Sequence, residues 1–138
     1  MKYIFVDTSA WDAIADRDDP HHDIAIAFKD EITTDCRLLV TNYILDELYT
    51  LLLMNLGYDG AVRFKQQLDL LMKAGIVEIL WVSEEVAIEA WEVFERFNKD
   101  KRWSFTDCVS YSVMKKKGIS EAFVFDQDFA QMGFLCRP

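Results

Sequence analysis

Short apolar runs and longer amphipathic stretches alternate along the chain, and this alternation predicts the secondary structure. The run YIFV at residues 3–6 is apolar at every position, which is typical of a strand buried on both faces of a parallel sheet. Further runs predict strands at 37–41, 76–82 and 122–125, and a final edge strand at 134–136. Helical patterns separate these runs, and such alternation is characteristic of parallel α/β folds.

The expected helices have recognisable starts and ends. Ser83 and Ser104 can cap helix N-termini, and Asp107 follows Ser104 at the spacing of a capping box. Three helical patterns are followed by a glycine, as helix C-caps are: Gly57, Gly75 and Gly118. We expect helices over 10–15, 20–32, 42–56, 58–74, 83–98, 104–117 and 127–132. The predicted fold is a three-layer α/β/α sandwich with a mainly parallel sheet of four or five strands, in one domain spanning 1–138.

The composition restricts the class of protein. Hydrophobic residues make up 51% of the 138 residues, which excludes general disorder. No signal peptide and no membrane-spanning segment is recognisable, so we expect a soluble, cytoplasmic protein. The three cysteines fit no metal-ligand spacing and are expected to be reduced core residues: Cys36, Cys108 and Cys136.

The formal net charge of −9 also limits what the protein binds. It argues against a broad basic face that grips nucleic acid. It suits a site that concentrates carboxylates and attracts metal cations, and it is compatible with a basic partner protein.

Two of the expected strands end on an aspartate. Asp7 follows YIFV, and Asp126 follows FVF. The carboxyl ends of parallel strands form the edge at which ligands bind in open α/β sheets. Thr8 and Ser9 place hydroxyls beside Asp7. Capping of the following helix alone would also explain an aspartate followed by two hydroxyl residues. Asp128 is a secondary candidate, because it can equally cap the short helix that follows.

Two further acids are expected on helices with apolar surroundings. Residues 42–56 are apolar nearly all round, so Glu47 should be buried, and no lysine or arginine in that helix can pair with it. A buried carboxylate needs either an ion pair from elsewhere or a cation. Asp107 lies in a first helical turn, where capping is the ordinary role of an acid, but its neighbours Phe105 and Cys108 are apolar. Thr106 offers a hydroxyl that can reach a phosphate or a water bound to metal.

Four carboxylates from separate junctions are therefore expected at one edge of the sheet: Asp7, Glu47, Asp107 and Asp126. They cannot all stay ionised there without cations, and oxygen-only sites suit Mg²⁺ and Mn²⁺. Such ions promote hydrolysis of phosphodiesters. No serine or cysteine triad is evident, and the two histidines, His21 and His22, are expected to cap a helix at the surface.

Five segments match one family in order and at its spacing: DTSA, DDPHH, TNYILDELYTLL, SFTDCVSYSVMKKKGI and FDQDFAQMGF. Together they resemble PIN-domain ribonucleases, above all the VapC-like toxins of toxin–antitoxin pairs. The resemblance implies that the same four acids hold Mg²⁺ or Mn²⁺ for RNA cleavage, with supporting hydroxyls at Thr8 or Ser9 and at Thr106. It also implies an RNA substrate, an antitoxin partner and a homodimer.

Basic residues near the expected site are candidates for contacts with RNA. Lys99, Lys101 and Arg102 precede Ser104, so we place them on the edge that carries Asp107, where they would contact phosphates. The lysines at 115–117 lie at the far end of the same helix and complement its C-terminus.

Other classes of protein compete with this interpretation. A haloacid-dehalogenase-type phosphatase would need an aspartate at the position of Ser9, and a phospho-receiver would need paired acids after the first strand. A PIN-like scaffold that binds RNA or a partner without cutting fits the net acidity, whereas the four intact acids favour catalysis.

Overall fold

A five-stranded, all-parallel sheet with the order β3-β2-β1-β4-β5 forms the centre of the computed structural model, which describes residues 2–138. The strands are β1 (Lys2–Val6), β2 (Cys36–Thr41), β3 (Val77–Leu80), β4 (Glu121–Phe123) and β5 (Leu135–Arg137). The chain builds the sheet from β1 towards β3 and then returns to the other side of β1 for β4. The order therefore reverses between β1 and β4, and such a switch point is where open α/β sheets bind ligands.

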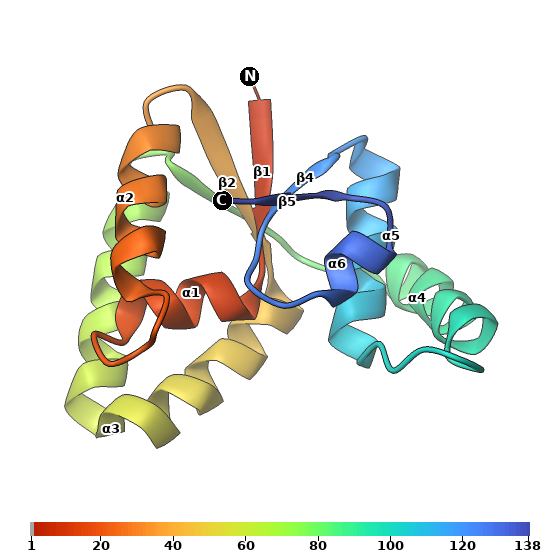
Figure 1. The fold of residues 1–138 in the computed structure, drawn as a ribbon, viewed down its shortest axis with the longest axis horizontal. Coiled ribbons are helices and arrows are strands. Elements are labelled where there is room, and N and C mark those ends of the chain that lie inside the picture. Colours follow the sequence, from red (N-terminus) through yellow and green to blue (C-terminus); the bar gives the residue numbers. More distant parts are fainter. Residues whose placement is uncertain (1) are drawn as a thin grey trace.

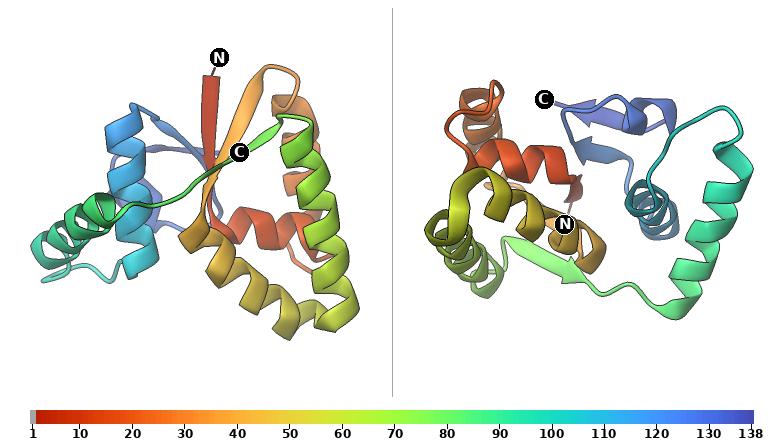
Figure 2. Two further views of the ribbon diagram at one scale, coloured as in Figure 1. Left: turned by 180° about the vertical axis from the view of Figure 1, so that it is seen from behind. Right: turned by 90° about the horizontal axis from the view of Figure 1, so that it is seen from below.

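Helices cover both faces of the sheet. They are α1 (Thr8–Ala15), α2 (His22–Ile32), α3 (Asn42–Lys73), α4 (Glu84–Phe97), α5 (Phe105–Lys117) and α6 (Asp128–Gln131). Helices α1, α2 and α3 lie on one side, while α5 and α6 lie on the other and α4 packs on the outside of α5 (Figures 1 and 2). This arrangement confirms the predicted three-layer sandwich with a parallel sheet. None of the helices within residues 2–138 is long and apolar enough to cross a membrane.

The central strand explains why the first apolar run does not alternate. Ile4, Phe5 and Val6 on β1 are all fully buried, because β1 has a neighbouring strand on each edge and helices on both faces. Burial of this kind is the main contribution to the stability of such a core. Trp11 and Trp103 also belong to the core, with exposed fractions of 1% and 3%.

Several details differ from the sequence-based expectation. The two helices expected at 42–56 and 58–74 are two arms of α3, which meet at Gly57 with φ 75° and ψ −177°, a conformation that favours glycine. Of the three free cysteines only Cys108 is buried, so the expectation of three core thiols is wrong for Cys36 and Cys136, which are half-buried. Helix α1 begins at Thr8, with Asp7 as its N-cap, so neither Thr8 nor Ser9 is the capping residue.

Candidate active site

Asp7 lies where β1 ends beside β4. Its backbone N–H donates to the carbonyl of Phe123 (3.0 Å), which joins the ends of the two strands. The carboxylate of Asp7 is buried, and its Oδ2 accepts hydrogen bonds from the N–H (3.2 Å) and the hydroxyl (2.9 Å) of Ser9. Burial and the charge of Asp126 raise the pKa of Asp7 to about 6, although the bonds from Ser9 oppose this shift. Asp7 is therefore an acid held in place in a poorly solvated position.

Asp107 is held at the same edge by the first turn of α5. Ser104 and Asp107 form the predicted capping box: the Asp107 N–H donates to Ser104 Oγ (3.0 Å), and the Ser104 N–H donates to Asp107 Oδ2 (3.4 Å). Burial, followed by repulsion from Asp7 and Asp126, raises the pKa of Asp107 to about 8. A capping role alone would favour the ionised form, so the raised pKa reflects burial first and the neighbouring acids second.

Asp126 reaches the site from the loop between β4 and α6, and Asp128 from the first position of α6. Asp126 Oδ1 accepts a hydrogen bond from the N–H of Asp128 (2.9 Å). Asp126 is exposed, but desolvation by the surrounding chain, together with the charges of Asp128 and Glu47, raises its pKa. The side chain of Asp128 does not cap α6, whose N-cap is Gln127; it lies close enough to Asp107 to raise the pKa of that acid further. Asp128 thus belongs to the acidic cluster, although the sequence pattern suggested an equal chance of helix capping.

Glu47 approaches the cluster from α3, but its expected burial is wrong. The side chain is exposed, because the first arm of α3 turns one face to solvent, and Glu47 lies on that face together with Asp46 and Thr50. Leu53 and Met54 on the same arm are 55% and 78% exposed. Glu47 is nevertheless close enough for its charge to raise the pKa of Asp126.

The expected hydroxyls have different environments. Ser9 Oγ donates to Asp7 and accepts from the N–H of Phe125 (3.0 Å), so it joins the two acid-bearing strand ends. Thr8 Oγ1 is buried without a hydrogen-bond partner. Thr106 is half-buried directly before Asp107.

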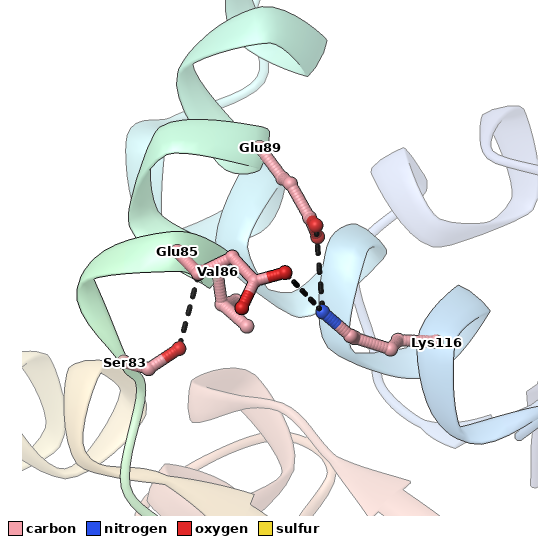
Figure 3. Close-up of polar contacts among 5 residues, drawn as sticks. All are labelled: Ser83, Glu85, Val86, Glu89 and Lys116. Carbon is pink, nitrogen blue, oxygen red and sulfur yellow. Dashed lines mark hydrogen bonds and ion pairs between the residues drawn. The ribbon is translucent and has the colours of Figure 1, made fainter.

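The basic residues fall into two groups. In the loop between α4 and α5, Lys99 and Arg102 are exposed, and Lys101 Nζ lies 3.5 Å from Asp100. At the far end of α5, Lys116 Nζ is bound by two glutamates of α4, Glu85 and Glu89 (Figure 3). Lys116 thus forms ion pairs at the surface, away from the aspartates at the edge of the sheet.

The histidines do not cap a helix with their side chains, contrary to expectation. His21 is the N-cap residue of α2 but makes no side-chain capping bond. Its ring is stacked on that of Phe125, with centroids 4.5 Å apart and planes 4° from parallel. His22 Nδ1 donates to the carbonyl of Ala13 (2.7 Å). Neither contact has a signal in the local sequence.

The acidic cluster fits a hard divalent cation by its donor chemistry. Five carboxylates contribute to it: Asp7, Glu47, Asp107, Asp126 and Asp128. All are oxygen donors, and their mutual repulsion is what a cation would offset. Across residues 2–138, no three or more His, Cys, Asp or Glu side chains already stand in an arrangement that could hold a metal ion. The carboxylates would therefore have to draw together around an ion.

The parallel α/β topology, with acids at the switch point where such sheets bind ligands, places this chain among the α/β proteins with an acidic site at the carboxyl ends of the strands. Within that class, the profile of the PIN domain matches residues 4–135, so the chain belongs to the PIN-domain family. Nucleases of this family generally use a divalent metal.

One relative matches in both sequence and structure. The chain is 33% identical over 135 residues to the 23S rRNA-specific endonuclease VapC20 of Mycobacterium tuberculosis, covering 96% of this chain and 95% of VapC20. The crystal structure of VapC20, a sarcin–ricin loop cleaving toxin, superimposes with a TM-score of 0.80 and 31% identity over 96% of each chain.

Two other relatives are more distant. A VapC ribonuclease of Archaeoglobus fulgidus is 36% identical over 80 residues, which span 58% of this chain and 48% of that protein. VapBC2 of Rickettsia felis, bound to a DNA fragment from its promoter, has a TM-score of 0.70 at 14% identity, over 99% and 98% of the chains. This last similarity is evidence of a shared fold.

Proposed function

We propose that this protein is an endoribonuclease that hydrolyses RNA phosphodiester bonds with Mg²⁺ or Mn²⁺ in the cytoplasm, and that it is the toxin of a type II toxin–antitoxin pair. The convergence of Asp7, Asp107 and Asp126, with each pKa raised by burial and by neighbouring acids, carries the proposal. Membership of the PIN-domain family and the similarity to VapC20 support it.

In this proposal each acid has a distinct role. Asp7 and Asp107 would hold the ion, since both are buried and accept hydrogen bonds from Ser9 and from the N–H of Ser104. Glu47, which is exposed, would share that ion or orient the attacking water, while Asp126 would complete the site with Asp128. When bound, the ion supplies positive charge that activates water and stabilises the phosphate oxygens. The expected products carry a 5′-phosphate and a 3′-hydroxyl.

The partners follow from chemistry and similarity together. Lys99, Lys101 and Arg102 lie in the loop that leads into α5, and we assign them contacts with RNA phosphates. The cognate antitoxin is expected to offer a basic segment to a chain with a net charge of −9. We also expect a homodimer, by resemblance to the family. Because VapC20 is specific for 23S rRNA, that RNA is the first substrate to test.

Cleavage by aspartate variants tests the activity. With Mn²⁺ and ribosomal RNA, Asp7→Asn and Asp107→Asn should each lower the cleavage rate at least about 100-fold, since each removes a proposed metal ligand. Asp23→Asn, which changes an exposed acid on α2, should cut at the wild-type rate. Wild-type cleavage by Asp107→Asn would refute the assignment. RNA binding without any cleavage by the wild type would identify a binding module instead.

The salt dependence of binding tests the basic loop. Binding is measured in the Asp107→Asn background, so that the RNA stays intact. Replacing both Lys101 and Arg102 by glutamine should lower the slope of log K against log salt concentration by about 1–2, because each cation that contacts a phosphate releases about one counterion. Lys73→Gln, at the end of α3, is the matched control and should not change the slope. If the double variant keeps the wild-type slope, RNA follows another path.

A further inference from the structure

The DDPHH turn at residues 18–22 is firmly attached to its surroundings, although nothing in the proposed chemistry uses it. Asp19 Oδ1 accepts a hydrogen bond from the N–H of His21 (2.8 Å), which fixes the backbone of the turn. His22 Nδ1 donates to the carbonyl of Ala13 in α1 (2.7 Å), which anchors the far side of the turn. The backbone of His21 is therefore held by its own N–H bond to Asp19, and the next residue is anchored to α1 through its ring.

The ring of His21 ends a column of aromatic rings that reaches the core. It is stacked on Phe125 at 4.5 Å, Phe125 meets Phe123 edge-on at 6.0 Å, and Phe123 meets Phe28 edge-on at 4.8 Å. Phe123 is fully buried and Phe28 nearly so, whereas Phe125 is only half-buried. His21 thus covers the side of Phe125 that the core leaves open.

Phe125 is also the residue that connects the acids. Its N–H donates to Ser9 Oγ (3.0 Å), and that hydroxyl donates to Asp7 Oδ2 (2.9 Å). The next residue is Asp126, whose side chain accepts from the N–H of Asp128 (2.9 Å). Strand β4 has only three residues and ends at Phe123, so no ladder of strand pairing reaches Asp126. The N–H of Val124 still donates to the carbonyl of Arg137 (3.1 Å), so beyond that bond the ring and the N–H of Phe125 are the contacts that lead the chain to Asp126.

We infer that His21 is a positioning residue: by stacking on Phe125 it fixes, relative to Asp7, the loop that carries Asp126 and leads into Asp128 at the start of α6. The physical requirement is general, since ligands of a metal site must be held within about 0.5 Å of their working geometry by packing around them. That a metal ion binds to the acids in this arrangement rests on the proposed function. That His21 fixes the loop does not rest on it, and this can be measured separately.

Amide hydrogen exchange in the metal-free protein tests the fixation directly. In His21→Ala, the amides of Phe125 and Asp128 should exchange about 3- to 10-fold faster, which corresponds to the loss of one aromatic pair. His21→Phe keeps a stacked ring and should restore exchange to within about twofold of the wild type. Asp18→Ala, an exposed change in the same turn, should have no effect. Unchanged exchange of the β1 amides excludes a general loss of stability.

Metal affinity and kinetics provide the second measurement. His21→Ala should bind Mn²⁺ about 3- to 10-fold more weakly and, at saturating Mn²⁺, keep its KM for RNA, while His21→Phe should match the wild type. Two outcomes would overturn the inference: exchange at Phe125 that is the same in His21→Ala and the wild type, or equal defects in His21→Ala and His21→Phe. A raised KM with normal exchange would instead show that His21 contacts RNA. If the protein cuts no RNA, the proposed function fails, but the exchange data still decide the role of His21.

Discussion

Two groups of charged residues in this protein differ in how their charge is balanced. At the edge of the sheet, desolvation and neighbouring acids raise the pKa values of Asp7, Asp107 and Asp126, and within residues 2–138 none of them forms an ion pair with a basic side chain. Between α4 and α5, Lys116 Nζ lies 3.5 Å from Glu85 and 3.4 Å from Glu89, so the acids there have a cation between them (Figure 3).

The two groups of acids therefore differ in their effect on the stability of the folded chain. Glu85 and its partner Lys116 are exposed, so water and salt screen them and their pairing has little effect on stability. Asp7 and Asp107 are buried next to like charge, which destabilises the folded chain unless protons or cations bind. Functional sites often keep such destabilising groups. Here the repulsion between the carboxylates is relieved when a cation binds, so the same repulsion provides affinity for an ion.

The largest expected effect concerns stability without metal. The raised pKa values of Asp7, about 6, and Asp107, about 8, mean that the folded state keeps protons that the unfolded chain releases above about pH 4. Stability in EDTA should therefore fall as the pH rises from about 4 to 8. Asp107→Asn removes one of the crowded charges and should raise stability at pH 8 by about 1–3 kcal/mol while abolishing activity. Urea unfolding at pH 5 and pH 8 measures both effects, and stability that rises with pH would contradict them.

The smallest effect should come from the balanced group, which is the control for this comparison. Lys116→Gln leaves Glu85 and Glu89 without their shared cation, but both carboxylates remain near the surface. Its urea midpoint should stay close to that of the wild type at both pH values, because exposed ion pairs contribute little. If Lys116→Gln changed the stability as much as Asp107→Asn does, burial would not distinguish the two groups.

Much of the fold could be predicted because it depends on local patterns. The sequence predicts a buried strand from the unbroken apolar run of β1, and it predicts serine caps before α4 and α5. Both features are present in the structure. The placement of Asp7 at the end of a buried strand follows from the same run. The adjacency of β1 and β4 could not be predicted in this way, because strand order is set by packing between elements distant in sequence.

Errors occurred where a local pattern was compatible with two environments. An apolar helix predicts burial of Glu47, but the first arm of α3 turns one face to solvent, and Glu47 lies exposed on it. The sequence left Asp128 open between a helix cap and the site; in the structure it is the first residue of α6, does not cap that helix and raises the pKa of Asp107. The stack of His21 on Phe125 joins opposite ends of the chain, and no spacing rule predicts such a contact.

Mn²⁺ binding to the metal-free protein at pH 7, followed by calorimetry in buffers of different ionisation enthalpy, is the most direct test of the acidic cluster. If crowded, partly protonated carboxylates form the metal site, the wild type should bind Mn²⁺ and release about one proton per ion, while Asp107→Asn should bind far more weakly. Absence of binding to the wild type, or equal binding with no proton release in both proteins, would contradict the central claim.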